Sequence, residues 1–492
     1  MTRRHRNILV ALLLLHLAVL AVYAMVRIAG GDEGVYFAAT HQVGLGNALY
    51  ADFFYTQMPL LPTIFSPLAL QGWNSFWILR GFAVLAGFLS AVLLFVITLK
   101  ITQKIEMALV SLGLYIFSGL ILSMHTIYES PVFAHCLGLA TFLVWIKFRE
   151  QRNLVYLIVL GLLLSALINM RATYIVLLPL YLWSVISLTV GTRLKGLMFF
   201  ALPMIPPAIP TFLAILASPR HFFFDNYMFQ IYRESDRSFA YFISSKLTAF
   251  FRTIIDPHLL IIIVLTVVSI IYLIRNRRVT SIKDISNKPE GMALGSLILI
   301  AFSYLFPHPI LRHYFEQFMA FAIIIIALNL EYFWARFNRL VVPARRNLIL
   351  AAVSIIYLLS LIPYVAIDIF AVRERERWRL LSEVKKVTGK MLELAGPTGT
   401  VLSERPLYPF LTRQPVLPYT EITAFHWPLP LDHAGFMEYK LCDSAYLKEK
   451  ISARTPSLVT IINNPPSYYA RELYEGYNLA YQSDAVSIFK RK

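Results

Sequence analysis

The chain has 492 residues, of which 58% are hydrophobic and only 15% are charged. This composition is too apolar for an ordinary soluble protein. A net charge of +17 could indicate a nucleic-acid-binding protein, but much of the basic charge lies in short connections between apolar runs. That placement indicates membrane topology, and we expect no nucleic-acid partner. With only Cys136 and Cys442 present, we expect neither a disulfide framework nor a cysteine metal site.

The apolar residues gather into runs of about 18–25 residues, the length that a helix needs to cross the hydrocarbon core. The first run follows a basic start and resembles a signal peptide, but ten further runs follow it, which favours an uncleaved helix. We expect about eleven transmembrane helices, at approximately 8–28, 76–99, 105–123, 131–147, 153–169, 173–190, 196–217, 257–275, 291–306, 314–333 and 347–367.

Every second connection between these runs is basic, and the positive-inside rule places such connections in the cytoplasm. We therefore expect a multi-pass protein of the plasma (inner) membrane with a cytoplasmic N-terminus. The odd number of spans puts the C-terminal domain outside the cytoplasm. The basic residues are Arg3, Arg4 and Arg6, Lys100 and Lys104, Lys147, Arg149 and Arg152, Arg193 and Lys195, and those of 275–288 and 336–346.

Two long external loops interrupt the predicted membrane domain, which covers 1–367. Loop 29–75 contains three prolines that break any long helix, so we expect short amphipathic helices at the interface. Loop 218–256 mixes aromatic and charged residues.

The tail 368–492 has shorter apolar runs and a higher charge density than the rest of the chain. Helical periodicity and short apolar or alternating runs predict a small α/β domain outside the membrane. Its predicted elements are a helix over 378–394 and strands over 400–402, 458–462 and 485–489.

The segment GGDEGVY, residues 30–36, directly follows the first apolar run. Carboxylates at a membrane edge are costly to bury and are usually kept for chemistry or transport. We interpret Asp32 and Glu33 as the start of a catalytic loop. They could also cap the helix exit, or pair with Arg27 or Arg80.

The stretch GDEGVYFAATHQVGLGNALYADFFYTQMPLLPTIFSPL resembles the first external loop of the GT-C membrane glycosyltransferases. Within that superfamily it is similar to the branch of protein O-mannosyltransferases and aminoarabinose transferases. The family pattern is an acidic pair with a tyrosine, a glycine-tyrosine-aspartate segment, prolines, and an arginine opening the second helix. Here the matching residues are Asp32, Glu33, Tyr36, Gly46, Tyr50, Asp52, Pro59, Pro62 and Arg80.

The resemblance implies an all-α polytopic bundle of GT-C type with interfacial helices and a small C-terminal extracytoplasmic α/β domain. It implies an inverting glycosyltransferase that moves a hexosyl or pentosyl unit from a polyprenyl-phosphate sugar. The acceptor would be a lipid, glycan or protein of the cell envelope, and membrane lipids would surround the enzyme. No cofactor is expected, although the carboxylates could hold a divalent cation, as in oligosaccharyltransferases.

The resemblance assigns the catalytic carboxylates. Asp32 matches the general base that takes the proton of the acceptor hydroxyl, and Glu33 would orient the loop or the acceptor. Glu129 precedes a proline-initiated helix, where family members carry an acidic residue facing the site. Alternatively, Glu129 is a helix N-terminal charge stabilised by the helix dipole. The substrate loop would include Tyr36, Tyr50 and Asp52.

The leaving phosphate requires positive charge, and arginine's planar fork suits phosphate oxygens. Arg171 lies in a minimal turn between two apolar runs, a costly position for an idle charge. Snorkelling of the side chain to lipid headgroups is the alternative. The external-side candidates for the donor phosphate are Arg80, Arg171, Arg312 and His313.

No metal site is predicted. His125, His308 and His313 match no ligand spacing and are better interpreted as core or interface histidines. Two other function classes stay open: a polytopic transporter or flippase, and a non-catalytic, lipid-binding membrane assembly protein. A transporter would show repeats and charges within its spans. Convergence of the acidic and basic candidates on one external cavity would distinguish the enzyme.

Overall fold

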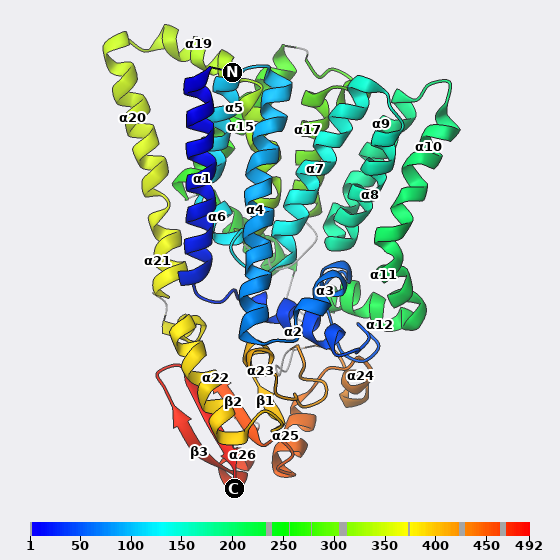
Figure 1. Ribbon diagram of the computed structural model, residues 1–492, viewed down its shortest axis with the longest axis vertical. Coiled ribbons are helices and arrows are strands. Elements are labelled where there is room, and N and C mark those ends of the chain that lie inside the picture. The colour runs from blue at the N-terminus through cyan, green and yellow to red at the C-terminus, as the bar shows by residue number, and fades with distance from the viewer. Residues whose placement is uncertain are drawn as a thin grey trace.

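The computed structural model describes residues 2–232, 239–254, 256–276, 278–304, 312–371, 374–422, 429–462 and 469–492. Long helices run side by side in a bundle, and a smaller domain with a sheet lies at one end (Figure 1). The N-terminus lies at the opposite end of the bundle, whereas the C-terminus lies in the small domain (Figure 1).

The bundle helices follow the apolar runs of the sequence. In chain order they are α1 (Arg3–Val26), α4 (Trp73–Thr102), α5 (Ile105–Ile116), α6 (Gly119–Met124), α7 (Ser130–Gln151), α8 (Val155–Met170), η2 (Ala172–Leu177), α9 (Leu178–Leu188), α10 (Arg193–Ala201), η3 (Leu202–Met204), α11 (Ile205–Ala217), α15 (Pro257–Arg275), α16 (Ile282–Asn287), α17 (Pro289–Ser303), η5 (Arg312–Phe315), α18 (Glu316–Ala327), α19 (Leu330–Leu340), α20 (Pro343–Leu359) and α21 (Ile362–Phe370).

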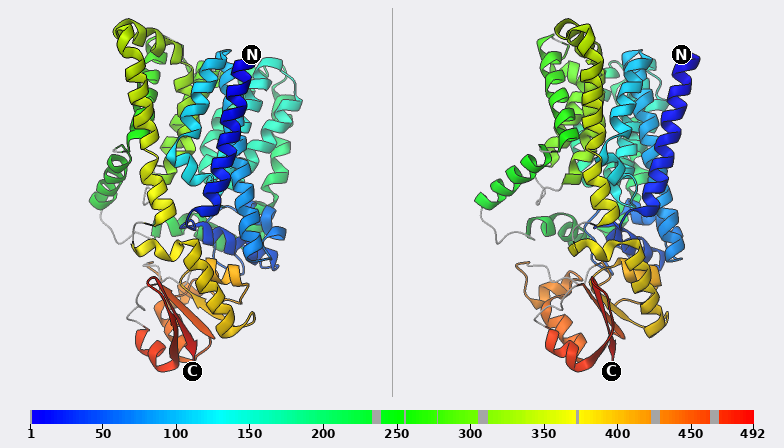
Figure 2. Two further views of the ribbon diagram at one scale, coloured as in Figure 1. Left: turned by 60° about the vertical axis from the view of Figure 1, so that its left-hand side comes forward. Right: turned by 90° about the vertical axis from the view of Figure 1, so that its left-hand side faces the viewer.

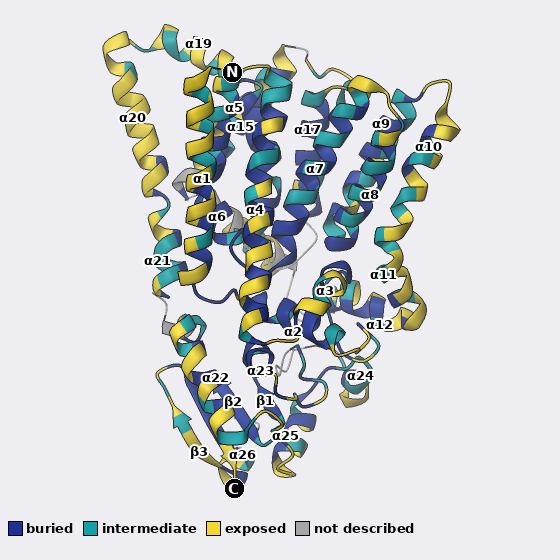
Figure 3. Ribbon diagram, viewed as in Figure 1, coloured by how far each residue is buried: buried dark blue, intermediate teal, exposed yellow. Residues whose placement is uncertain are grey.

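The outer faces of the bundle are apolar although they are exposed, as the yellow stretches of α1 and α20 in Figure 3 show. Leu14, Leu216 and Leu348 remain 61%, 79% and 70% exposed. A monomeric soluble protein rarely leaves so much contiguous apolar surface uncovered. Lipid is the solvent that such a surface suits, so the chain is a multi-pass membrane protein.

Five helical stretches of the described chain are long and apolar enough to cross a membrane: Arg3–Val26, Trp73–Thr102, Ser130–Gln151, Arg193–Ala217 and Pro343–Phe370. A sixth is added if α18 and α19, which are bent by 59° at their junction, count as one span. The remaining predicted runs coincide with apolar helices of only 10–17 residues. Each of the predicted runs is therefore helical, while the count of eleven spans stays a prediction.

The run predicted at 105–123 is divided into α5 and α6. Ser118 caps α6 by accepting a hydrogen bond from the Ile121 amide at 3.5 Å. A serine side chain that competes for the backbone in this way favours a helix start over a continuous helix. Hydropathy alone does not show this break.

Short helices gather where the bundle meets the small domain. Those of loop 29–75 are α2 (Glu33–Gly44), α3 (Leu60–Phe65) and η1 (Ser66–Leu68), and those of loop 218–256 are α12 (Pro219–Phe223), the π-helix η4 (Phe224–Met228), α13 (Phe229–Tyr232) and α14 (Phe239–Ile254). The views of Figure 2 show α14, in green, extending away from the bundle.

Helix α2 differs from the expected amphipathic interfacial helix because nine of its twelve residues are buried. The small domain covers the face that would otherwise meet the interface, and Phe37 stacks on Phe410 with ring centroids 4.8 Å apart. A Cβ at Gly34 would lie 3.1 Å from Leu407 Cβ. Glycine at this position therefore allows α2 and the small domain to approach closely.

The small domain is α/β, as predicted. Its sheet has the order β1-β2-β4-β3, with β1 parallel to β2 and the other neighbours antiparallel. The predicted strands correspond to β1 (Val401–Ser403), β2 (Leu458–Ile462) and β4 (Val486–Arg491), while β3 (Tyr477–Gln482) escaped prediction. The helices are η6 (Glu374–Arg379), α22 (Leu381–Ala395), α23 (Leu407–Thr412), α24 (His433–Glu438), α25 (Ser444–Ser452) and α26 (Ala470–Gly476).

The predicted orientation can be tested with a cysteine at each end of the molecule. Asp484→Cys places a thiol on the small domain at a side chain that is 88% exposed, and Arg193→Cys places one in a basic connection. In intact cells, a membrane-impermeant maleimide should label Asp484→Cys but not Arg193→Cys, and detergent should make both reactive. Labelling of Arg193→Cys alone would reverse the orientation. The unsubstituted chain controls for Cys136 and Cys442.

Candidate functional site

The chain leaving α1 is tied to the helix that precedes the small domain. Arg27 is 1% exposed and its guanidinium lies 3.4 Å from the Asp368 carboxylate. The Ile28 amide donates to the Asp368 carbonyl at 2.7 Å. Ala29 exchanges two hydrogen bonds with Arg379: its amide donates to the Arg379 carbonyl at 2.8 Å, and its carbonyl accepts from Arg379 Nε at 2.6 Å. These contacts fix the backbone immediately before the acidic pair.

Glu33 and Arg80 form a fully buried, two-point ion pair. Arg80 Nε donates to Glu33 Oε1 at 2.8 Å and Nη2 donates to Oε2 at 2.7 Å. The same carboxylate accepts from the amides of Gly30 at 2.8 Å and Tyr128 at 3.0 Å. Burial alone would raise the pKa of Glu33, but the charge and hydrogen bonds of Arg80 hold that pKa below its ordinary value. Glu33 is therefore an ionised anchor joining α2, α4 and the segment before α7.

This anchoring role also occupies Arg80. Besides its two bonds to Glu33, the guanidinium donates to the carbonyls of Ala24 at 2.7 Å and Ile28 at 3.2 Å. Four of its five N–H donors are thus engaged, and the side chain is 1% exposed. No fork remains for a phosphate, so we assign neither donor binding to Arg80 nor proton transfer to Glu33.

Asp32, in contrast, presents an available carboxylate. It is exposed and stands one residue before α2, whose first turn begins with the Val35 amide bonding to the Asp32 carbonyl at 2.9 Å. Its carboxylate has no hydrogen bond or ion pair to any described residue. Since the backbone on both sides is fixed, Asp32 is held in place while its side chain remains exposed.

Glu129 lies close to this acidic pair and is buried, with 6% of its surface exposed. Gly30 provides its space, because a Cβ there would lie 2.8 Å from Glu129 Oε1. Burial, together with the negative charges of Asp32 and Glu33, raises the pKa of the Glu129 carboxyl to about 8. Glu129 is therefore mainly protonated at neutral pH. Asp32 is its neighbouring acid.

Arg171 supplies a cation to the same end of the bundle. Its Nη1 lies 3.4 Å from Ser130 Oγ, and its guanidinium carbon lies 5.7 Å from the centre of the Tyr314 ring. Its Nε is buried without a hydrogen-bond partner, and no carboxylate of the described chain forms an ion pair with it. The guanidinium also forms a hydrogen bond with Tyr304. With its Nε unpartnered and no described carboxylate paired to it, it remains suited to an anionic ligand.

Tyr36 connects the arginine to α2. Its hydroxyl lies 2.9 Å from Ser130 Oγ, the atom that Arg171 also approaches, and Ser130 directly follows Glu129 in the chain. Residues from α2, the start of α7 and the turn after α8 thus meet in one place. Of the predicted residues, Asp32, Tyr36, Glu129 and Arg171 belong to this cluster, which we name the loop-end site.

Tyr50 and Asp52 shape the loop and do not join the loop-end site. Asp52 accepts a hydrogen bond from the Ala48 amide at 2.6 Å, and Tyr50 donates to the Gln57 carbonyl at 2.6 Å. Tyr50 adopts a φ of 67° and is fully buried. The side chains of Arg312 and His313, and the whole of His308, lie outside the described residues.

The small domain contributes residues that sequence patterns did not indicate. Arg379 lies within electrostatic reach of Glu129, and Arg405 within reach of Asp32. Arg405 also stacks over Trp378, with its guanidinium carbon 4.1 Å from the ring centre. More than 300 positions separate these arginines from the acidic pair, so no local motif reveals them. Their proximity adds positive charge near Asp32 and Glu129.

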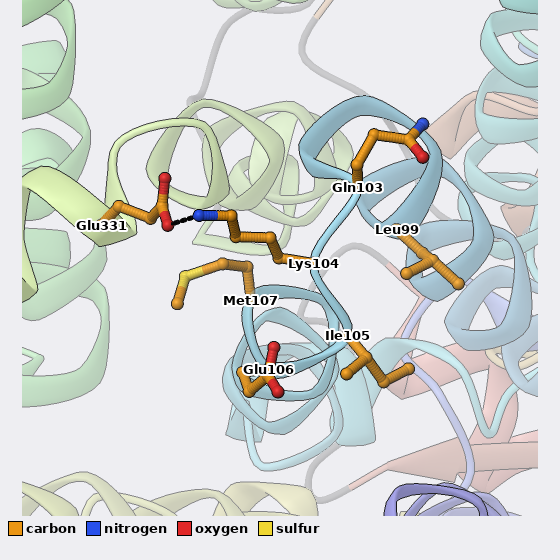
Figure 4. A pocket seen from close by; sticks show the side chains of 7 residues that line it. All are labelled: Leu99, Gln103, Lys104, Ile105, Glu106, Met107 and Glu331. Carbon is orange, nitrogen blue, oxygen red and sulfur yellow. Dashed lines mark hydrogen bonds and ion pairs between the residues drawn. The ribbon is translucent and has the colours of Figure 1, made fainter. Parts of the chain in front are cut away.

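Two surface pockets lie away from the loop-end site. One of about 620 Å³ is formed by Lys104, Glu106, Glu331 and their neighbours, with Lys104 paired to Glu331 (Figure 4). Another of about 420 Å³ lies between α2 and the small domain and is lined by His41, Phe410 and others. Neither is lined by Asp32, Glu129 or Arg171.

The importance of the Glu33–Arg80 pair can be measured by unfolding. Replacing one partner strands a buried charge, which typically costs about 3–5 kcal/mol. Arg80→Met and Glu33→Gln should each lower the thermal unfolding midpoint of the detergent-solubilised protein strongly, and the double variant should lose less than the sum. Glu150→Gln, which breaks an exposed pair with Lys100, is the control and should cost about 0–1 kcal/mol. Equal losses in Arg80→Met and the control would refute the anchor.

Neither a family model nor a curated protein matches the sequence. Among solved structures, ArnT from Cupriavidus metallidurans bound to undecaprenyl phosphate is similar, with a TM-score of 0.65 and 12% identity over 98% of this chain and 97% of that chain. The apo state of that protein gives a TM-score of 0.64 and 11% identity. An oligosaccharyltransferase from Archaeoglobus fulgidus gives a TM-score of 0.49 and 12% identity over 91% of this chain and 68% of that chain.

The similarity to ArnT extends over nearly the whole of both chains, so it includes the bundle, the loop helices and the small domain together. ArnT is an aminoarabinose transferase, a GT-C glycosyltransferase. This chain therefore has the overall fold of the ArnT structures, which is the fold expected from the sequence.

Proposed function

We propose that the protein is an inverting glycosyltransferase that transfers a monosaccharide from a polyprenyl-phosphate sugar to an acceptor on the external face of the membrane. The observation that carries this proposal is the loop-end site, where an unpartnered carboxylate, a neutral carboxyl and an incompletely satisfied arginine converge. The ArnT fold supports the lipid-linked donor, since the ArnT structure holds undecaprenyl phosphate.

Asp32 is suited to the role of general base. The acceptor hydroxyl attacks the anomeric carbon as its proton passes to the Asp32 carboxylate, and the bond from that carbon to the phosphate oxygen breaks. Such a displacement needs no covalent enzyme intermediate, so one positioned carboxylate suffices. Asp32 is free to act because Glu33, its neighbour, carries the structural ion pair.

Glu129 complements this base in its protonated form. A neutral carboxyl can donate a hydrogen bond to an oxygen of the sugar or the acceptor. It also avoids a second negative charge beside Asp32, which would repel the donor phosphate. The raised pKa of about 8 supports this division of labour between the two acids.

Arg171 is suited to the departing lipid phosphate. Charge develops on the phosphate as the glycosidic bond breaks, and a fixed guanidinium stabilises it without reorganisation. The Tyr314 ring and Ser130 hold the arginine in position. A transporter or a non-catalytic assembly protein would not require a proton acceptor to lie near a residue that binds phosphate.

The first test is Asp32→Asn, which keeps the size of the side chain but removes its ability to accept the proton. A screen of polyprenyl-phosphate monosaccharides with the purified protein identifies the donor, with release of polyprenyl phosphate as the readout. Loss of a general base typically lowers the rate by about 10²–10⁴-fold. The substitution should therefore reduce turnover by that amount and leave donor binding nearly unchanged.

Asp484→Asn, an exposed substitution on the small domain, is the matched control and should retain full turnover. A folded Asp32→Asn protein with normal turnover would remove Asp32 from the base role. If no donor in the screen is turned over by the wild-type protein although polyprenyl phosphate binds, the non-catalytic lipid-binding alternative gains support.

The second test concerns Arg171 and uses polyprenyl phosphate without a sugar, bound to the protein in nanodiscs. Removing a charge-assisted hydrogen bond costs about 1.5–3 kcal/mol, or about one to two orders of magnitude in affinity. Arg171→Ala should show this loss, and Arg171→Lys should retain part of the affinity because it keeps the charge but not the fork.

Arg193→Ala, in a basic connection at the far end of the bundle, is the control for a general loss of positive charge. Its affinity should match that of the wild-type protein. Unchanged binding in Arg171→Ala would mean that the side chain serves only its contacts with Ser130 and Tyr314, and Arg312 would become the next candidate.

A further inference from the structure

A second cluster of ionisable side chains lies inside the bundle, apart from the loop-end site. It consists of His125 directly after α6, His135 in α7 and Glu316 at the start of α18. The three side chains are 0%, 2% and 0% exposed. Their potential ligand atoms all lie within 4.8 Å of one another. Ionisable groups in such a position are rare in membrane proteins and usually functional.

Both imidazoles converge on one carboxylate oxygen. His125 Nε2 and His135 Nδ1 each lie 2.7 Å from Glu316 Oε1. The contact from His125 has hydrogen-bond geometry, whereas His135 Nδ1 has no aligned hydrogen-bond partner. Two further buried atoms of the cluster, His125 Nδ1 and Glu316 Oε2, also lack a hydrogen-bond partner.

Unsatisfied polar atoms in an apolar interior cost about 1–3 kcal/mol each. Two imidazole nitrogens crowd one carboxylate oxygen, and Glu316 Oε2 beside them has no hydrogen-bond partner in the described chain, so the cluster calls for a further group. The donors that are present, two imidazole nitrogens and a carboxylate oxygen, are the ligands of zinc sites that keep a fourth position open. Magnesium and calcium prefer oxygen ligands alone and suit the cluster less well.

The surroundings of His135 are those of a metal ligand. Its second ring nitrogen, Nε2, lies 2.9 Å from the Tyr115 hydroxyl. A metal-binding histidine generally donates its other N–H to an oxygen, which fixes the tautomer and the ring orientation. With Nε2–H donating to Tyr115, the lone pair of Nδ1 faces Glu316 and His125.

The packing of His125 brings its ring close to that of His135. A Cβ at Gly87 in α4 would lie 2.7 Å from His125 Cβ, so glycine lets the turn that carries His125 approach the helix. The two imidazole rings lie with centroids 5.0 Å apart at 74° to one another. Such crossed rings can direct their nitrogens to one point from different helices.

We propose that His125, His135 and Glu316 bind one divalent transition-metal ion, with zinc as the best match. The ion would join three elements that support the loop-end site: the turn that leads from α6 to Glu129, the first turns of α7 after Ser130, and α18. Metal-to-ligand distances of about 2.0–2.2 Å require only that the three side chains move slightly apart. The site stands independently of the proposed transferase activity.

The test uses the full-length protein, purified through a tag without histidine. After chelation and dialysis, added zinc should be retained at about one ion per chain, measured by elemental mass spectrometry, and the thermal unfolding midpoint should rise. Cobalt in place of zinc should give the intense visible absorption of a tetrahedral ion. His135→Asn and Glu316→Gln should each abolish retention.

Tyr115→Phe separates a metal site from a merely structural cluster. Loss of this partner typically weakens metal binding by about 10–100-fold, so the variant should fold but retain zinc less tightly. His41→Asn, which removes a histidine outside the cluster, is the matched control and should retain the ion normally. If the wild-type protein retains no zinc and shows no cobalt absorption, the proposal fails and the cluster is a hydrogen-bonded pair of histidines on Glu316. Equal retention by the wild-type protein and the Glu316→Gln variant would likewise overturn it.

Discussion

The buried ion pair between Arg80 and Glu33 is the interaction on which the site depends. It joins the first loop to α4 and, through the Tyr128 amide, to the segment before α7. Neither charge could remain in this interior alone, because an unpaired buried ion is far more costly than the pair. The position of the adjacent Asp32 is thereby fixed although its own carboxylate forms no structural contact with the described residues. Of the two neighbouring acids, Glu33 anchors the loop and Asp32 stays available.

The small domain is part of the site and not an appendage. Its α23 covers α2, and Arg379 holds the backbone of Ala29 from the other side. The positive charges of Arg379 and Arg405 lie within electrostatic reach of Glu129 and Asp32, respectively. The loop that would carry the chemistry is thus fixed between the membrane bundle and the domain. This arrangement fixes the position of Asp32, which lies in the first loop directly before α2.

Much of the architecture could be predicted from the sequence because its physical signals are local. Apolar runs place most of the bundle helices, and short apolar or alternating runs place three of the four strands. The acidic pair, Glu129 and Arg171 stand out because charge beside apolar runs is costly. What could not be predicted depends on partners distant in the chain. The sequence leaves open whether Arg80 binds a phosphate or pairs with the acidic residues, and only its contact with Glu33 decides this. His125 gains meaning only beside Glu316, 191 positions later.

The raised pKa of Glu129 links the assembly of the site to proton uptake. In the unfolded chain this carboxyl would ionise near its ordinary pKa of 4.5, whereas in the folded protein it retains its proton up to about pH 8. Folding at neutral pH therefore binds a proton at this position. The free energy of unfolding from this group is highest below pH 4.5 and declines as the pH rises through that interval. Alkaline conditions therefore remove stability at the contact between Gly30 in the first loop and Glu129, directly before α7.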